Sequence, residues 1–137
     1  HMIRSVMEGV AYGLRDSLEV MKELELPIRH VRVSGGGARS KLWRHILSGA
    51  KHQEIVTMNS AEGAAFGAAV LAGVGSGIFK NLQEACAKMI RVIDVIRPDT
   101  KAVEIYDDYY KIYRSLYPLL KEKFFELSRA SSCSKKL

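Results

Sequence analysis

The sequence predicts a helix-rich α/β domain with a small sheet, and three observations lead to this fold class. Apolar residues recur every three or four positions through most of the 137-residue chain, which is typical of amphipathic helices. Short apolar runs rich in valine and isoleucine lie between those stretches, as strands do in α/β domains. Apolar residues make up 47% of the chain, which is enough for a hydrophobic core.

The N-terminal part is predicted to alternate between helix and strand. Apolar residues at helical spacing indicate a helix over 3–25, and Pro27 ends it because proline cannot continue a helix. A short strand follows at 28–33. The next helix is expected over 39–48, closed by Gly49. It should bury three apolar side chains: Leu42, Ile46 and Leu47.

A second strand and a small-residue helix are predicted next. After a strand at 54–57, Asn59 or Ser60 can cap a helix over 61–72, with Glu62 completing a capping box. Glycine inside a helix costs about 1 kcal/mol relative to alanine, so its presence needs a reason. We interpret the two glycines of this helix as sites of close packing on the sheet rather than as ligand contacts: Gly63 and Gly67.

The C-terminal part is predicted to be mainly helical. A helix over 81–90, an extended run over 92–96 and a long helix over 102–127 follow a glycine turn, and Pro118 should bend the long helix or start a new one. The turn glycines are Gly73, Gly75 and Gly77. We expect six apolar residues of the long helix to face the body of the domain: Ile105, Tyr109, Ile112, Leu116, Leu119 and Leu127.

The long helix also carries tyrosines and a pair of acids that resemble functional features. Tyrosines at helical spacing more often form a packing stripe than a stacking surface. They are Tyr106, Tyr109, Tyr110, Tyr113 and Tyr117. Asp107 and Asp108 are adjacent, but we place them on the solvated face near the N-terminus of the helix, where carboxylates are favourable.

The most informative stretch is the run of three glycines at 35–37, between the strand at 28–33 and the helix at 39–48. Glycine allows positive φ and lets a ligand approach bare backbone. The helix that follows points its free N–H groups and positive dipole end at the turn. Arg39 and Lys41 add positive charge, so we predict an anion site, and a nucleotide phosphate is the usual anion. A turn or flexible connector without a ligand is the alternative.

Two common phosphate motifs do not fit these glycines. A P-loop needs a Gly-Lys pair followed by Ser or Thr, which the sequence lacks. In the dinucleotide-binding pattern, Ser40 stands where the third glycine belongs, and Glu54 poorly matches the acidic residue expected after the next strand. A nucleotide-dependent oxidoreductase is therefore disfavoured.

Two segments carry a resemblance to a known family: Ser-Gly-Gly-Gly-Ala-Arg-Ser-Lys-Leu-Trp-Arg at 34–44 and Glu-Gly-Ala-Ala-Phe-Gly-Ala-Ala-Val-Leu-Ala-Gly at 62–73. In this order and spacing they resemble the C-terminal domain of the FGGY carbohydrate kinases, over about residues 3–129. The resemblance implies an actin-like ATPase, ribonuclease H-like fold, here partial and with a short remnant sheet. It also implies that this domain holds the adenosine half of ATP.

The resemblance also implies which residues bind the nucleotide. Gly35 lies in the phosphate loop, while Gly36, Gly37 and Ala38 would lie against the phosphates and the ribose. Three residues at the start of the next helix would approach the adenine edge: Ser40, Lys41 and Leu42.

In this family the catalytic half of the site lies upstream of these motifs. Its first phosphate motif, its sugar-binding residues and its catalytic aspartate match nothing in this chain. We therefore expect no catalytic or metal-ligating residue here, ATP or ADP as ligand, and Mg²⁺ held mainly by the missing part. That part, a sugar-binding N-terminal domain, is the expected partner. The parent would phosphorylate a sugar, a pentulose by resemblance, and the fragment alone would be inactive because phosphoryl transfer needs positioned charge and bound Mg²⁺.

Composition argues against several other classes of protein. The formal net charge is +6, but the basic residues are interspersed with acids, so we expect no nucleic-acid binding. No apolar run approaches the roughly 18 to 20 residues of a membrane span, so we expect no membrane contact. Cys86 and Cys133 lack metal-site spacing and fit a reducing cytoplasm.

The expected organisation is a single domain with short additions. Residues 1–2 resemble a remnant of an expression tag, 3–129 form the domain, and 130–137 form a flexible tail. With so few strands, exposed sheet edges and apolar surface favour self-association. The alternative function is a helical interaction module that binds a partner protein through the tyrosine stripe, with the glycines serving only as a turn.

Overall fold

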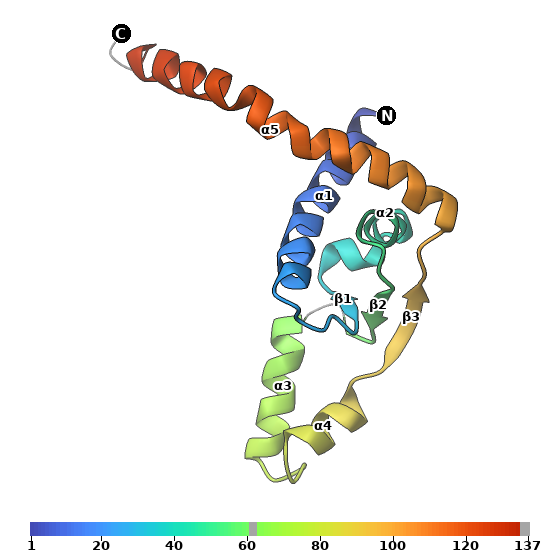
Figure 1. Ribbon diagram of the computed structural model, residues 1–137. Helices are drawn as coiled ribbons and strands as arrows, with labels where there is room; N and C mark the ends of the chain where they lie inside the picture. The colour runs from blue at the N-terminus through green and yellow to red at the C-terminus, as the bar shows by residue number, and fades with distance from the viewer. Residues whose placement is uncertain (61–62, 135–137) are drawn as a thin grey trace.

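The computed structural model describes residues 1–60 and 63–134 and has a helix-rich α/β fold, as the sequence predicts (Figure 1). Its helices are α1 (Met2–Glu23), α2 (Lys41–Lys51), α3 (Gly63–Gly75), α4 (Leu82–Met89) and α5 (Thr100–Ser134), with a short 3₁₀ helix η1 (Gly36–Arg39). Its strands are β1 (Val31–Val33), β2 (Ile55–Met58) and β3 (Val92–Ile96). Helix α5 lies across α1 and α2 at one end of the molecule, whereas α3 and α4 lie at the other end (Figure 1).

The three strands form one mixed sheet in the order β1-β2-β3. Strand β1 pairs with β2 in parallel, with Val31 opposite Ile55, and α2 makes the connection between them. Strand β3 pairs with β2 in the antiparallel direction. Within the described residues, β1 therefore has a partner on one side only, and its other edge is open.

The core lies between the sheet and the layer formed by α1, α2 and α5. Ile46 and Ala50 of α2 are buried against Ile55 of β2 and Ile96 of β3. Ala11 and Tyr12 of α1 complete this cluster together with two tyrosines of α5: Tyr106 and Tyr110. Arg44 ties α2 to the sheet, since its Nη1 pairs with the Asp94 carboxylate and lies 3.3 Å from the Thr57 hydroxyl. This ion pair holds the pKa of Asp94 below its usual value.

Helix α2 differs from the prediction at both ends. It begins at Lys41 rather than at residue 39, because the chain first forms η1 and Ser40 then caps α2 by accepting a hydrogen bond from the Trp43 N–H. Leu42 therefore lies in the first turn and is half exposed rather than buried. Gly49 does not close the helix, which continues to Lys51 and ends at His52 in a left-handed conformation (φ 54°). Ile46 and Leu47 are buried as predicted.

Gly49 is instead a point of close helix packing. A Cβ atom there would lie 2.7 Å from the ring of Tyr106, closer than real Cβ atoms approach. Glycine at this position therefore lets the backbone of α2 rest directly on a tyrosine of α5. The prediction misread this glycine because the residue serves equally well as a helix terminator and as a site of close approach.

The predicted glycine turn near α3 is also corrected, and Asn59 does not cap that helix. Gly73 lies inside α3, where a Cβ would lie 2.9 Å from the Phe79 ring, and Gly75 is the last residue of that helix. Of the three predicted turn glycines, only Gly77 has a positive φ, at 78°. Asn59 is bound elsewhere, since its side chain donates to the Met89 carbonyl and accepts from the Arg91 N–H. The capping box with Glu62 lies outside the described residues.

Helix α5 turns a different face to the core from the one predicted. The six residues expected to face the body are between 46% and 73% exposed, while Tyr106 and Tyr110 are buried and Tyr113 packs beside them. Tyr12 selects this face, because its ring lies 5.4 to 6.2 Å from the rings of those three tyrosines. Pro118 lies inside α5 and no new helix starts there.

We expect Gly49→Ala to destabilise the fold by about 1–3 kcal/mol, because the added methyl group would force α2 away from Tyr106. Urea denaturation of the purified chain measures this change. Gly67→Ala in α3 is the matched control, since a Cβ there meets no atom within 4 Å and alanine favours a helix by about 1 kcal/mol. Equal stability of the Gly49→Ala variant and the unmodified chain would contradict the proposed close contact.

Candidate functional site

The glycine run forms a tight turn between β1 and α2. Gly35 has a φ of 80°, a left-handed conformation that glycine adopts without strain. Residues Gly36–Arg39 then form η1, in which the Ala38 N–H donates to the Gly35 carbonyl. The N–H groups of Gly36 and Gly37 come before this first 3₁₀ bond, so the helix itself gives them no acceptor. The turn therefore offers two main-chain donors near the N-terminus of α2.

A hollow of about 600 Å³ lies beside this turn. Its walls come from the turn and from the start of α3, and nearly all are small residues: Ser34, Gly35, Gly36, Arg39, Gly63, Ala64 and Ala65. A Cβ built on Gly35 or Gly36 would meet no atom within 4 Å, so the main chain at these two positions is open. Arg39 is the charged residue of the lining, and within residues 1–60 and 63–134 it enters no ion pair. The hollow thus combines bare backbone with a cationic side chain, which suits an anion.

The structure places the predicted nucleotide-binding residues unequally around this hollow. Gly35 and Gly36 line it. Gly37 does not, because its missing side chain would point at the Trp43 ring, 3.2 Å away. Ala38 follows Gly37 within η1 and does not line the hollow either.

The residues expected at the adenine edge begin the next helix. The Ser40 hydroxyl accepts a hydrogen bond from the Trp43 N–H, so it acts as the cap of α2. Lys41 and Leu42 are exposed in the first turn. None of the three lines the hollow, although all lie within a few residues of it along the chain.

Sequence reasoning missed the opposite wall of the hollow, which is built by Gly63, Ala64 and Ala65. A Cβ on Gly63 would lie 3.7 Å from the Ser34 hydroxyl oxygen, so α3 begins directly beside the end of β1. The many small residues of α3 are the sequence feature that could have indicated this wall. From the sequence, its glycines are interpreted as close packing on the sheet, but a Cβ on Gly67 would meet nothing within 4 Å.

A second, apolar hollow of about 400 Å³ adjoins the first, and Ser34 and Gly63 line both. Its lining comes from α3, α4 and the sheet and includes Met58, Phe66, Leu71, Cys86 and Ile90. The polar and apolar hollows together could receive a ligand with an anionic end and a flat or apolar end.

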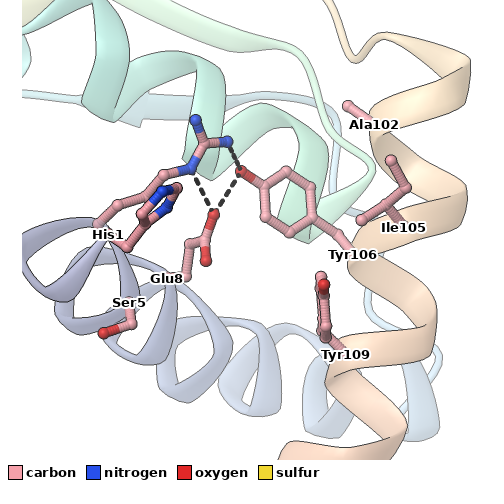
Figure 2. A pocket seen from close by; sticks show the side chains of 8 residues that line it. His1, Ser5, Glu8, Ala102, Ile105, Tyr106 and Tyr109 are labelled. Carbon is pink, nitrogen blue, oxygen red and sulfur yellow. Dashed lines mark hydrogen bonds and ion pairs between the residues drawn. The ribbon is translucent and has the colours of Figure 1, made fainter.

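A third hollow lies between α1 and α5, but its polar groups satisfy one another (Figure 2). Arg4 Nε donates to Glu8 Oε1 at 2.8 Å, and Arg4 Nη2 donates to the Tyr106 hydroxyl at 3.2 Å. That hydroxyl in turn donates to Glu8 Oε1. Burial raises the pKa of Tyr106, which keeps the phenol protonated. The arrangement holds α1 to α5.

The adjacent acids of α5 have separate structural partners. Asp107 Oδ1 lies 2.7 Å from Arg15 Nη2 and 2.9 Å from His52 Nε2, and the Arg15 guanidinium lies over the Tyr110 ring at 4.0 Å. Asp108 pairs with Lys111 on the surface. Among the described residues, no group of three or more His, Cys, Asp or Glu side chains is arranged to hold a metal ion. Nor does any described helix have the length and apolarity to cross a membrane.

Comparison with known proteins identifies the relatives of this chain. Residues 1–76 match the model of the FGGY family of carbohydrate kinases, C-terminal domain. A xylulose kinase of Staphylococcus epidermidis is 31% identical over 119 residues, which cover 87% of this chain and 24% of that protein. A gluconokinase of Bacillus subtilis is 32% identical over 130 residues, covering 94% of this chain and 23% of that protein.

The fold agrees with these sequence matches. The crystal structure of xylulose kinase from Rhodospirillum rubrum superposes with a TM-score of 0.76 at 28% identity, covering 91% of this chain and 25% of that one. The expected actin-like fold of the sugar kinases is therefore confirmed. The chain spans about a quarter of the length of the relatives it matches.

We expect the chain to lose stability as the pH falls below about 6.5, the ordinary pKa of histidine. Burial, reinforced by the positive charge of Arg15, lowers the pKa of His52 in the folded state. The unfolded chain then binds a proton that the folded chain excludes, so acid favours unfolding. Urea denaturation at pH 7.5 and 5.5 measures the effect.

The matched variant for this test is His52→Asn, because asparagine tolerates the left-handed conformation of this position but does not titrate. The loss of stability between the two pH values should be smaller in the variant. An equal loss in both proteins would show that His52 is not responsible.

Proposed function

Because the chain belongs to the FGGY family of carbohydrate kinases, we propose that it is the nucleotide-binding part of an ATP-dependent sugar kinase. The reaction of the whole protein would be transfer of the γ-phosphate of ATP to a sugar hydroxyl. The observation that carries the proposal is the open main chain at Gly35 and Gly36, facing a hollow that also contains Arg39.

The phosphates would be held by main-chain N–H groups and one cation. The Gly36 and Gly37 N–H groups and the positive dipole end of α2 favour negative charge. Arg39 would pair with a phosphate oxygen, and its charge would then be compensated. Small residues on the α3 side leave room for the ribose. Ser40, Lys41 and Leu42 remain the proposed residues at the adenine edge, with Gly37 and Ala38 shaping the turn.

The chemical step needs groups that the described residues do not provide together. A bound Mg²⁺ would neutralise charge on the transferred phosphate, and its ligands would come mainly from the rest of the protein. The base that accepts the proton of the sugar hydroxyl would come from there as well. Binding and orientation of the nucleotide are the proposed contributions of this chain.

We propose that an N-terminal, sugar-binding portion completes the protein. Three features of the described residues support a large missing neighbour. Strand β1 has an open edge, Leu71 of α3 is 61% exposed, and Gly67 faces empty space. An added strand beside β1 would extend the sheet beneath α3 and cover this apolar surface.

We propose D-xylulose as the sugar, with xylulose 5-phosphate as the product. The support comes from relatives named xylulose kinase in several bacteria. A gluconokinase has a comparable identity of 32%, which fits a site whose sugar contacts lie outside this chain. The tyrosine-stripe alternative has less support, since Tyr106, Tyr110 and Tyr113 pack on Tyr12 and do not form a surface.

Gly36→Val should weaken nucleotide binding by at least about tenfold, because its side chain would occupy the space in which a phosphate approaches. Titration calorimetry with ADP and with Mg-ATP measures the affinity. Gly36 is a cleaner target than Gly37, where a side chain would strike Trp43 and disturb the turn. Gly9→Val in α1 is the control and should bind normally, since a Cβ there meets no atom within 4 Å and Gly9 lines neither of these two hollows. If the unmodified chain gives neither heat nor chemical-shift changes at millimolar nucleotide, the proposal fails for this chain.

The 137-residue chain alone should not phosphorylate D-xylulose. Without a positioned base and Mg²⁺ ligands, bound ATP is held but not activated. A coupled assay for ADP release, with and without the sugar, measures turnover. Sugar-dependent ADP release above background would show that the described residues include catalytic groups.

A further inference from the structure

Ser34 has the one uncharged polar side chain among the described residues that line the hollow beside the glycine turn. Apart from Arg39, the other residues of this lining are glycines and alanines. In the proposed function, Arg39 pairs with a phosphate oxygen. Within this lining, a side-chain hydrogen bond to an uncharged part of the ligand would therefore come from Ser34.

The hydroxyl group of Ser34 is available to a ligand. The residue is exposed, and within residues 1–60 and 63–134 its hydroxyl forms no hydrogen bond. Two other short polar side chains near the turn and the sheet are already engaged. Ser40 caps α2, and Asn59 binds main-chain groups of Met89 and Arg91. Ser34 therefore differs from these two residues in having no structural partner of this kind.

Ser34 lies where the polar hollow and the apolar hollow meet. Ser34 and Gly63 line both of them. A Cβ on Gly63 would lie 3.7 Å from the Ser34 hydroxyl oxygen, so the absence of a side chain at position 63 leaves this side of the hydroxyl uncovered. A ligand that extends from one hollow into the other would pass between these two residues.

The main chain fixes the position of Ser34 relative to the proposed phosphate site. Ser34 directly follows the last residue of β1, and Gly35 then turns the chain with a φ of 80°. Ser34 and Gly36 are two residues apart, so their Cα atoms are separated by at most about 7 Å. The ribose of a nucleotide is bonded directly to its first phosphate. A first phosphate held at Gly36 would therefore bring the ribose within reach of Ser34.

We propose that Ser34 is a specificity-determining residue that binds the ribose hydroxyls of the nucleotide, an inference that rests on the proposed function. A serine hydroxyl can donate one hydrogen bond and accept another at the same time, which matches the two adjacent hydroxyls of a ribose. A nucleotide that lacks both hydroxyls leaves Ser34 without these bonds in the complex. The site therefore selects ribonucleotides over dideoxyribonucleotides.

The first test compares ADP with 2′,3′-dideoxy-ADP by titration calorimetry. The unmodified chain should bind ADP about five- to tenfold more tightly, because the analogue cannot form the hydrogen bonds to Ser34. Ser34→Ala should bind the two ligands within about twofold of each other, whereas Ser34→Thr keeps the hydroxyl and should keep the preference. Ser17→Ala is the matched control, since it removes an exposed hydroxyl of α1 that lines neither hollow.

The second test locates the ribose hydroxyls by chemical-shift changes in the unmodified chain. Both ligands carry the same phosphates, so they should shift the Gly36 N–H signal alike, while the Ser34 and Gly63 signals should differ between the two complexes. Equal affinity of the unmodified chain for both ligands, an undiminished preference in Ser34→Ala, or identical Ser34 signals in both complexes would each overturn the proposal and leave nucleotide binding at Gly36 intact. If neither nucleotide binds, the proposed function is refuted and this inference with it.

Discussion

The contact of α2 with α5 through Gly49 and Tyr106 positions α2 and the glycine turn that precedes it. Since Gly49 has no side chain, the backbone of α2 rests directly on the Tyr106 ring of α5, which also packs against Tyr12 of α1. Helix α2 is thereby fixed on one side by α5 and on the other by the Arg44–Asp94 pair with the sheet. The N-terminus of α2, and with it the glycine turn, takes its position from these contacts. The proposed nucleotide site is thus supported by packing at the opposite end of α2.

Local sequence patterns were sufficient to identify most helices and strands, but not the side of α5 that packs. Ile105, Tyr109 and Ile112 repeat at helical spacing, and so do Tyr106, Tyr110 and Tyr113, one position later. Both stripes are apolar enough to be buried, so periodicity alone could not choose between them. The rings of Tyr12 make the choice through contacts between residues about a hundred positions apart. The error at Gly49 has a similar origin, because its role depends on a tyrosine more than fifty residues later.

The candidate site also has one part that the sequence predicted and one part that it did not. The turn at Gly35 and Gly36 was predictable, because glycines between a strand and a helix favour a tight turn through local backbone conformation. The wall formed by Gly63, Ala64 and Ala65 was not, since it depends on α3 returning to the end of β1. Gly37 shows the limit of reading a motif residue by residue. Gly37 belongs to the same run of glycines, yet it packs against the Trp43 ring and does not line the hollow.

The packing of α1 against α5 has a consequence for how the chain folds. Hydrogen bonds join Arg4 to Tyr106 and Asp16 to Tyr110, pairs separated by 102 and 94 positions. During synthesis on a ribosome, Tyr12 of α1 has no tyrosine partner until α5 follows, whereas α2 can pack on α1 much sooner. Contacts between residues so far apart in sequence make folding slower than in a chain stabilised by neighbouring segments alone.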